Sequence, residues 1–247
     1  MSSLRFGKQP RKSDYRTLRL RTYLGRALAP PPAAYDALDR VFSALGRSDV
    51  AALFPMDGND RLGDCTIAAA AHAVTLWKGL VGELSIMSEP KVTKLYLHLA
   101  KGIDTGLVEL DVLDYWRKSA INDEKILAFA SIDIHNHEHV KQAITLFGGV
   151  YLGFAVQADC EADFKARRPW TPGPMLLGSG HAVFATGYDD AGLTVLTWGS
   201  TQKATWDWWD HCVDEAYAVL PSTARKADFA PGFDFDQLAA DLQLVAN

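Results

Sequence analysis

The residue with the clearest chemical potential is Cys65, which lies where an alanine-rich apolar run begins. A turn-forming segment that includes Gly63 precedes it, and apolar residues recur after it at helical spacing as far as Trp77. This pattern predicts a buried helix that begins at or near Cys65. Unpaired N–H groups and the positive end of the helix dipole favour a thiolate there. Cys65 is therefore a candidate nucleophile, although a cysteine at a helix start is more often a small packed residue.

A second reactive group, His181, lies far downstream in the segment Gly-Ser-Gly-His-Ala-Val at 178–183. It opens an apolar strand pattern, and the next strand pattern ends at Trp198 and Gly199. Cys–His catalysis needs a cysteine and a distant histidine of this kind, because the two side chains meet in space and not in sequence. We therefore expect His181 to lie beside Cys65.

Together these motifs resemble the papain-like cysteine peptidase superfamily. Its members carry a glutamine six residues before the nucleophile and a glycine two residues before it, and these positions hold Asn59 and Gly63 here. The segments 181–183 and 198–199 are similar to the superfamily's His-Ala-Val strand and Trp-Gly pair. Asp64 stands directly before the cysteine, and this Asp-Cys pair resembles the nucleophile segment of the bacteriocin-processing peptidases. The resemblance covers about residues 57–220.

The resemblance implies a role for each candidate site residue. Cys65 would be the nucleophile and His181 its base, while the Asn59 amide and the Cys65 backbone N–H would hold the oxyanion. Asn59 is one methylene shorter than the superfamily's glutamine. An Asn or Asp normally orients the histidine, and Thr197 stands at that position, sixteen residues after His181.

The identity of this third residue stays open. Alignment on the Trp-Gly pair places Leu196 there, and leucine cannot orient an imidazole. Asp189 or Asp190, on the turn between the two strand patterns, could serve instead, or the third residue could be absent.

The predicted elements indicate an α+β protein, in which a helical lobe carrying Cys65 packs on an antiparallel sheet or half-barrel carrying His181. In addition to the segment that follows Cys65, helical patterns cover residues 34–45, 92–100, 110–120 and 140–146. Strand patterns cover residues 149–156, 181–188, 193–197 and 216–220. The resemblance implies the same papain-like, two-lobed architecture.

We expect three parts along the chain. Residues 1–33 form a basic arm, which either packs across the domain or contacts an acidic partner. Residues 34–220 form the papain-like domain, with a helical lobe over about 34–147 and a sheet lobe over about 148–220. Residues 221–247 form a tail with an amphipathic acidic helix, which docks on the domain or supports a homodimer through the arm and tail.

The composition limits the classes of partner. A net charge of −5 over 247 residues does not suggest nucleic acid. No apolar run approaches the length of a membrane span, and the first residues lack the apolar segment of a signal peptide. The cysteines are three, an odd number, which favours free thiols and a cytoplasmic location.

No cofactor is expected for thiol chemistry. A His-Asn-His-Glu-His segment at 135–139 could bind zinc, but no further ligand lies at close spacing, and a loop followed by a helix start fits better. Cys160 and Cys212 lack the context of Cys65 and are interpreted as structural.

We expect a thiol hydrolase that cleaves a peptide or isopeptide amide in a peptide or protein substrate through an acyl-thioester. An acyltransferase would use the same thioester. The departures at Asn59 and at Thr197 or Leu196 are also compatible with an inactive papain-like protein used for binding or structure.

Overall fold

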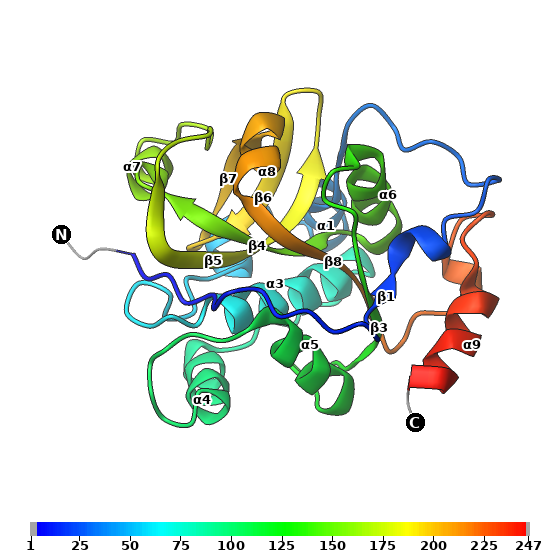
Figure 1. Ribbon diagram of the computed structural model, residues 1–247, viewed down its shortest axis with the longest axis horizontal. Helices are drawn as coiled ribbons and strands as arrows, with labels where there is room; N and C mark the ends of the chain where they lie inside the picture. Colours follow the sequence, from blue (N-terminus) through cyan, green and yellow to red (C-terminus); the bar gives the residue numbers. More distant parts are fainter. Residues whose placement is uncertain (1–3, 246–247) are drawn as a thin grey trace.

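The computed structural model describes residues 4–245 and consists of one twisted sheet with helices on both of its faces (Figure 1). Residues 1–3 of the expected arm and 246–247 of the expected tail lie outside the described part. The α+β class is confirmed, with one continuous sheet that runs through the molecule.

The helices are mostly short. They are α1 (Ala37–Leu45), α2 (Val50–Leu53), α3 (Cys65–Leu80), α4 (Glu89–Leu99), α5 (Glu109–Lys118), α6 (His137–Phe147), α7 (Cys160–Lys165), α8 (Trp206–Cys212) and α9 (Phe235–Val245), with 3-10 turns η1 (Leu20–Thr22) and η2 (Lys226–Asp228).

The strands are β1 (Leu18–Arg19), β2 (Tyr35–Asp36), β3 (Ile126–Ser131), β4 (Val150–Gln157), β5 (Met175–Tyr188), β6 (Gly192–Thr197), β7 (Ser200–Thr205) and β8 (Val213–Pro221). Their order in the sheet is β1-β3-β8-β4-β5-β6-β7, and β2 pairs with β5. All pairs are antiparallel except β1 with β3.

Two hydrophobic cores lie on opposite faces of this sheet, because successive strand residues point to opposite sides. In β4, Val150 and Leu152 pack in the core shared with α6 and α8, whereas Tyr151 packs in the core shared with α3. Almost every side chain of α3 is buried, which explains its alanine-rich sequence: it crosses the second core with neighbours on all sides.

Most predicted elements are present, but several strands were not predicted, among them β2, which replaces the start of the helix expected over 34–45, and β3 and β7. β3 lies within the part expected to form the helical lobe, yet it pairs with β8 as a member of the sheet. β7 completes a hairpin with β6. Short apolar runs such as Ile126–Ser131 have no period that separates a buried strand from a helix.

The basic arm crosses the boundary between the sheet and helices α3 to α5, as the dark blue trace in Figure 1 shows. It then continues to the edge strand β1 and to the C-terminal tail. There Tyr23 donates a hydrogen bond from its hydroxyl to Asp241, and the Gly25 N–H donates to the Gly232 carbonyl. Arm and tail thus contact each other within one chain, and a homodimer through them stays a prediction.

Within residues 4–245, no helix is long and apolar enough to cross a bilayer.

Candidate active site

Cys65 is the first residue of α3, as its sequence context predicted. Its side chain is only 1 % exposed. This burial raises the pKa of the thiol to about 12, although backbone hydrogen bonds from Ala182 and Gly7 act in the opposite direction. The sulfur is therefore a neutral thiol in this conformation.

The turn before α3 brings Asn59 next to the helix start. Asp57 and Gly58 have φ values of 59° and 91°, which turn the chain sharply. The Asn59 Nδ2 then donates to Asp64 Oδ1 over 2.6 Å, so one of its two N–H groups is engaged away from any substrate. The other Asp64 oxygen, Oδ2, is buried without a hydrogen-bond partner, and burial raises the pKa of this carboxyl to about 7.

His181 lies on β5 and contacts Thr197 at the end of β6. Its Nε2 is 2.9 Å from Thr197 Oγ1, while its Nδ1 is buried without a hydrogen-bond partner. The imidazole stacks on the Trp198 indole, with 4.5 Å between ring centroids and 19° between planes. Burial lowers the pKa of His181 to about 3, so the ring is neutral.

The β6–β7 hairpin explains why Thr197 and not Leu196 meets the histidine. Leu196 pairs with Phe184, and both side chains pack in the core against α3. Thr197 therefore points to the opposite face, and the two-residue turn after it, with positive φ at Trp198 and Gly199, folds the indole back over His181. Asp189 instead stabilises its own turn, accepting the Ala191 and Gly192 N–H groups.

Cys65, His181, Asn59 and Thr197 all line one small cavity, together with Trp198 and His72. The cavity has a volume of about 10 Å³, about the space that one water molecule needs. All four predicted site residues thus converge, but the site has no room for a substrate as it stands.

The arm closes the site, which the sequence did not reveal. Gly7 pairs with Leu107, whose N–H donates to the Gly7 carbonyl over 2.8 Å, and the Lys8 N–H donates to the Gly180 carbonyl over 2.9 Å. The Phe6 ring packs edge-on against His181, with 5.8 Å between centroids. The arm therefore lies directly on Cys65 and His181.

Only glycine fits at position 7. A Cβ built there would lie 1.9 Å from the Gly63 carbonyl oxygen, just before the helix start. Gly106 faces the arm in the same way, since its Cβ would lie 1.9 Å from the Gly7 oxygen. Backbones can approach this closely only at glycines. The glycines at positions 7, 63 and 106 were therefore the available sequence signal of this contact.

The remaining candidates lie elsewhere. Cys160 and Cys212 are buried in the core on the other face of the sheet, where burial raises the pKa of both thiols. The His135–His139 segment forms the start of α6, with the Asn136 side chain accepting the His139 N–H. His137 Nε2 lies 2.7 Å from Asp210 Oδ1. Residues 4–245 contain no cluster of three metal-ligating side chains.

Comparisons with protein-family models and with curated protein sequences give no match, whereas comparison of the fold does. Xylellain, a cysteine protease from Xylella fastidiosa, superposes with a TM-score of 0.63 at 14 % identity, over 90 % of this chain and 97 % of its own. Digestive procathepsin L 3 of Tenebrio molitor larval midgut gives 0.60 at 12 % identity, over 87 % and 75 %. The Carica candamarcensis cysteine protease CMS1MS2 gives 0.55 at 17 % identity, over 78 % and 100 %. Likeness at such identities concerns the fold.

Proposed function

We propose that this chain, which has the fold of the papain-like cysteine proteases, is itself a cysteine peptidase that is held in a latent state by its N-terminal arm. The observation that supports this most is the convergence of Cys65 and His181 on one cavity, with Thr197 on the far nitrogen of the imidazole. The start of α3 and the hairpin of β5 and β6, which are far apart in sequence, supply the parts of a Cys–His site.

Because Nε2 of His181 is engaged by Thr197, Nδ1 is the imidazole nitrogen left to act as the base. If Nε2 carries the proton and donates it to Thr197 Oγ1, the Nδ1 lone pair stays available. Nδ1 then takes the Cys65 thiol proton, and the thiolate attacks the amide carbonyl carbon. His181 returns the proton to the leaving amine, and a water molecule hydrolyses the thioester.

Stabilisation of the oxyanion would come from the start of α3. The Cys65 backbone N–H is one donor, and the second N–H of the Asn59 amide is the other, with the first held by Asp64. Asp64 thereby fixes the plane of the Asn59 amide.

Latency follows from burial. The charged thiolate–imidazolium pair is disfavoured under the arm, because burial raises the pKa of Cys65 and lowers that of His181. When the arm leaves, water enters and both shifts diminish, so the ion pair becomes accessible. The same movement frees the surface against which a substrate would lie.

The test is to open the cleft and measure both thiol reactivity and hydrolysis in the full-length chain. Gly7→Ala places a methyl against the Gly63 carbonyl and should displace the arm. We expect this variant to hydrolyse a mixed fluorogenic peptide library, and its Cys65 to react with iodoacetamide well below the ordinary thiol pKa of about 8.5.

The controls separate the peptidase from its alternatives. Adding Cys65→Ala or His181→Ala to Gly7→Ala should abolish hydrolysis. Product formed only when an amine acceptor is supplied would indicate an acyltransferase. If the opened variant hydrolyses nothing, and its Cys65 titrates as an ordinary thiol, the peptidase proposal is wrong and the fold serves binding.

A further inference from the structure

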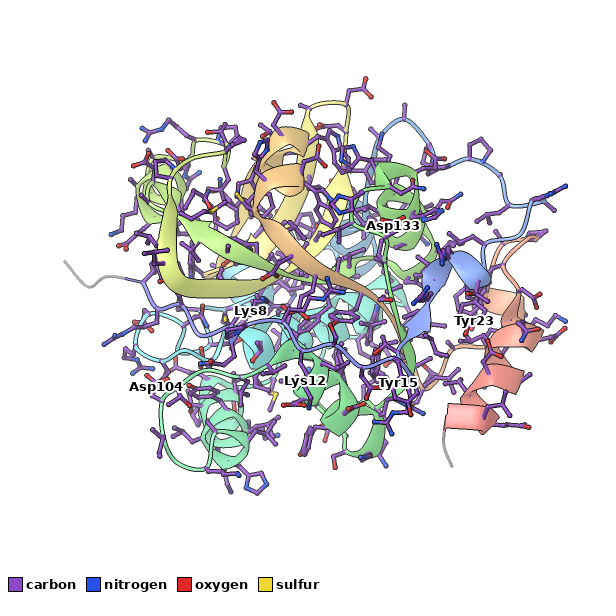
Figure 2. All side chains as sticks on the ribbon, viewed as in Figure 1. Lys8, Lys12, Tyr15, Tyr23, Asp104 and Asp133 are labelled. Atoms are coloured by element: carbon purple, nitrogen blue, oxygen red, sulfur yellow. The ribbon has the colours of Figure 1, made fainter. Side chains whose placement is uncertain are left out.

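Lys8, the arm residue next to Gly7, extends its side chain into a closed slot between the sheet and α5. The side chain is 2 % exposed, and its Nζ lies 2.8 Å from Asp214 Oδ2 and 3.0 Å from Glu215 Oε1. Figure 2 shows Lys8 on the arm at the middle of this face, with Lys12 further along near α5. Other arm cations, such as Lys12, form exposed ion pairs.

The walls of the slot match a long aliphatic stem. At Gly153 of β4, an added Cβ would lie 2.0 Å from Lys8 Cε and 2.7 Å from Glu109 Oε1. The missing side chain of Gly153 therefore makes the room through which the lysine stem reaches the carboxylates. Any larger residue at position 153 would close the slot.

The slot contains more acid than one lysine requires. Glu109 is fully buried, and neither of its carboxylate oxygens has a hydrogen-bond partner. Glu215 accepts from the Tyr217 hydroxyl with one oxygen and faces Lys8 with the other. Burial, followed by repulsion between the two acids, raises the pKa of Glu109, and burial raises that of Glu215. Lys8 is the cation that both acids face, and it compensates the oxygens that no hydrogen bond satisfies.

The slot lies immediately beside the reacting groups. The Gly7 backbone contacts the Cys65 thiol, and Lys8 is the next residue. Gly153 pairs in the sheet with Ala182, the neighbour of His181, and the Lys8 N–H donates to the Gly180 carbonyl. A peptide that replaced the arm would lay a side chain over the same slot.

We propose that this slot, formed by Gly153, Glu109, Asp214 and Glu215, is a specificity pocket that selects a lysine or arginine side chain of the substrate close to the cleaved bond. The inference rests on the proposed peptidase function, and it identifies Lys8 as an internal occupant of the substrate's position. Substrates are therefore basic peptides.

The experiment uses full-length Gly7→Ala/Lys8→Ala, in which the arm is displaced and the slot is vacant. Blocked peptides of one sequence carry lysine or its uncharged analogue norleucine at each position in turn. We expect one peptide position near the cleaved bond at which the lysine peptide has a kcat/KM at least about tenfold higher than the norleucine peptide. Adding Glu109→Gln and Glu215→Gln should remove that preference, as should Gly153→Ala, which fills the slot without changing charge.

Asp111→Asn is the matched control, because Asp111 pairs with Lys12 on the exposed surface and lies outside the slot. It should leave the preference unchanged. Circular dichroism checks that each variant is folded. If the variant with Glu109→Gln and Glu215→Gln does not fold, Gly153→Ala still tests the pocket.

A second readout separates failure of the pocket from failure of the peptidase. With Cys65→Ala added, calorimetric titration should show the lysine peptide binding at least about tenfold more tightly than the norleucine peptide. Hydrolysis of both peptides without discrimination overturns the pocket and leaves the peptidase. Selective binding without any hydrolysis retains the pocket and overturns the peptidase.

Discussion

At the scale of single residues, two polar contacts hold the side chains of the candidate site. Thr197 provides a neutral hydroxyl at the far nitrogen of His181, and Asp64 holds the amide of Asn59. A hydroxyl orients the imidazole, but it can accept from Nε2–H or donate to a bare Nε2, and it adds no negative charge to stabilise an imidazolium. The orientation of the ring is therefore shared with the Trp198 stack.

Thr197→Val removes the hydroxyl and keeps the shape of the side chain. In the Gly7→Ala background, we expect kcat/KM to fall roughly tenfold, about the worth of one neutral hydrogen bond. Thr197→Ser, which retains the hydroxyl, should restore most of the rate. An orienting role also predicts that the acidic limb of the pH–rate profile moves in Thr197→Val and returns in Thr197→Ser. Equal rates in all three proteins would contradict it.

Asp64→Asn should change the pH dependence of stability. The folded-state pKa of Asp64 is about 7, above the ordinary value of 3.8, so the group contributes stability below 3.8 that is lost as pH rises through 7. The amide cannot ionise, and its oxygen can still accept from Asn59. We therefore expect Asp64→Asn to exceed the wild type in unfolding free energy by more at pH 8 than at pH 5. Urea titrations at the two pH values measure this difference.

At the scale of elements, the site is assembled by the start of α3, the strands β5 and β6 with their turns, and the arm. The arm contributes backbone, not bulk: Gly7 fits between Gly63 and Gly106 because none of the three has a side chain. Closure of the site by the arm therefore depends on the backbone contacts of Gly7 with Gly63 and Gly106, which a single added methyl group would break.

Gly106→Ala and Gly102→Ala form a matched pair that tests this closure by changing the residue that faces Gly7 and leaving the arm unchanged. Both glycines have positive φ, 76° and 80°, so alanine is strained similarly at each. Only at Gly106 would the Cβ meet the arm, whereas at Gly102 nothing lies within 4 Å. We expect Cys65 to be alkylated at least about tenfold faster in Gly106→Ala than in Gly102→Ala. Similar rates would show that the arm opens without help.

Sequence reasoning identified the residues of the site, but it did not reveal that the arm covers them. Cys65 and His181 carry local signals, a helix start and a strand start, and Thr197 was among the residues considered because of its spacing. The slot has no such signal, because Gly153 and Glu215 meet through the register of β4 and β8, whereas Glu109 is brought there by the start of α5. β3 was not predicted for another reason: its short apolar run has no period that separates a buried strand from a helix.

At the scale of the whole molecule, the later part of the arm and the C-terminal tail are joined at the sheet edge. Phe233 of the tail packs against Phe147 of α6 and Tyr23 of the arm, and the Asp234 N–H donates to the Tyr23 carbonyl. The later part of the arm is thus anchored independently of its first residues. Displacement at Gly7 need not detach the whole arm.

Phe233→Ala should reveal how much this anchor contributes. Phe233 is 8 % exposed, and loss of its ring is expected to lower the unfolding free energy by about 3 kcal/mol. Leu244→Ala in the same tail is the control, since Leu244 is 76 % exposed and the change should stay within about 0.5 kcal/mol. Urea unfolding of both variants measures the contrast, and equal stabilities would show that the tail is dispensable.

The slot for Lys8 also sets an order of events during synthesis. Lys8 and Asp214 are 206 positions apart, so the arm leaves the ribosome long before the strand that completes its binding site. Closing so long a loop is slow, and the contact cannot form until β8 has been made and has paired with β3 and β4. A newly made molecule therefore passes through an interval in which its own lysine is unbound and its acids are exposed to solvent.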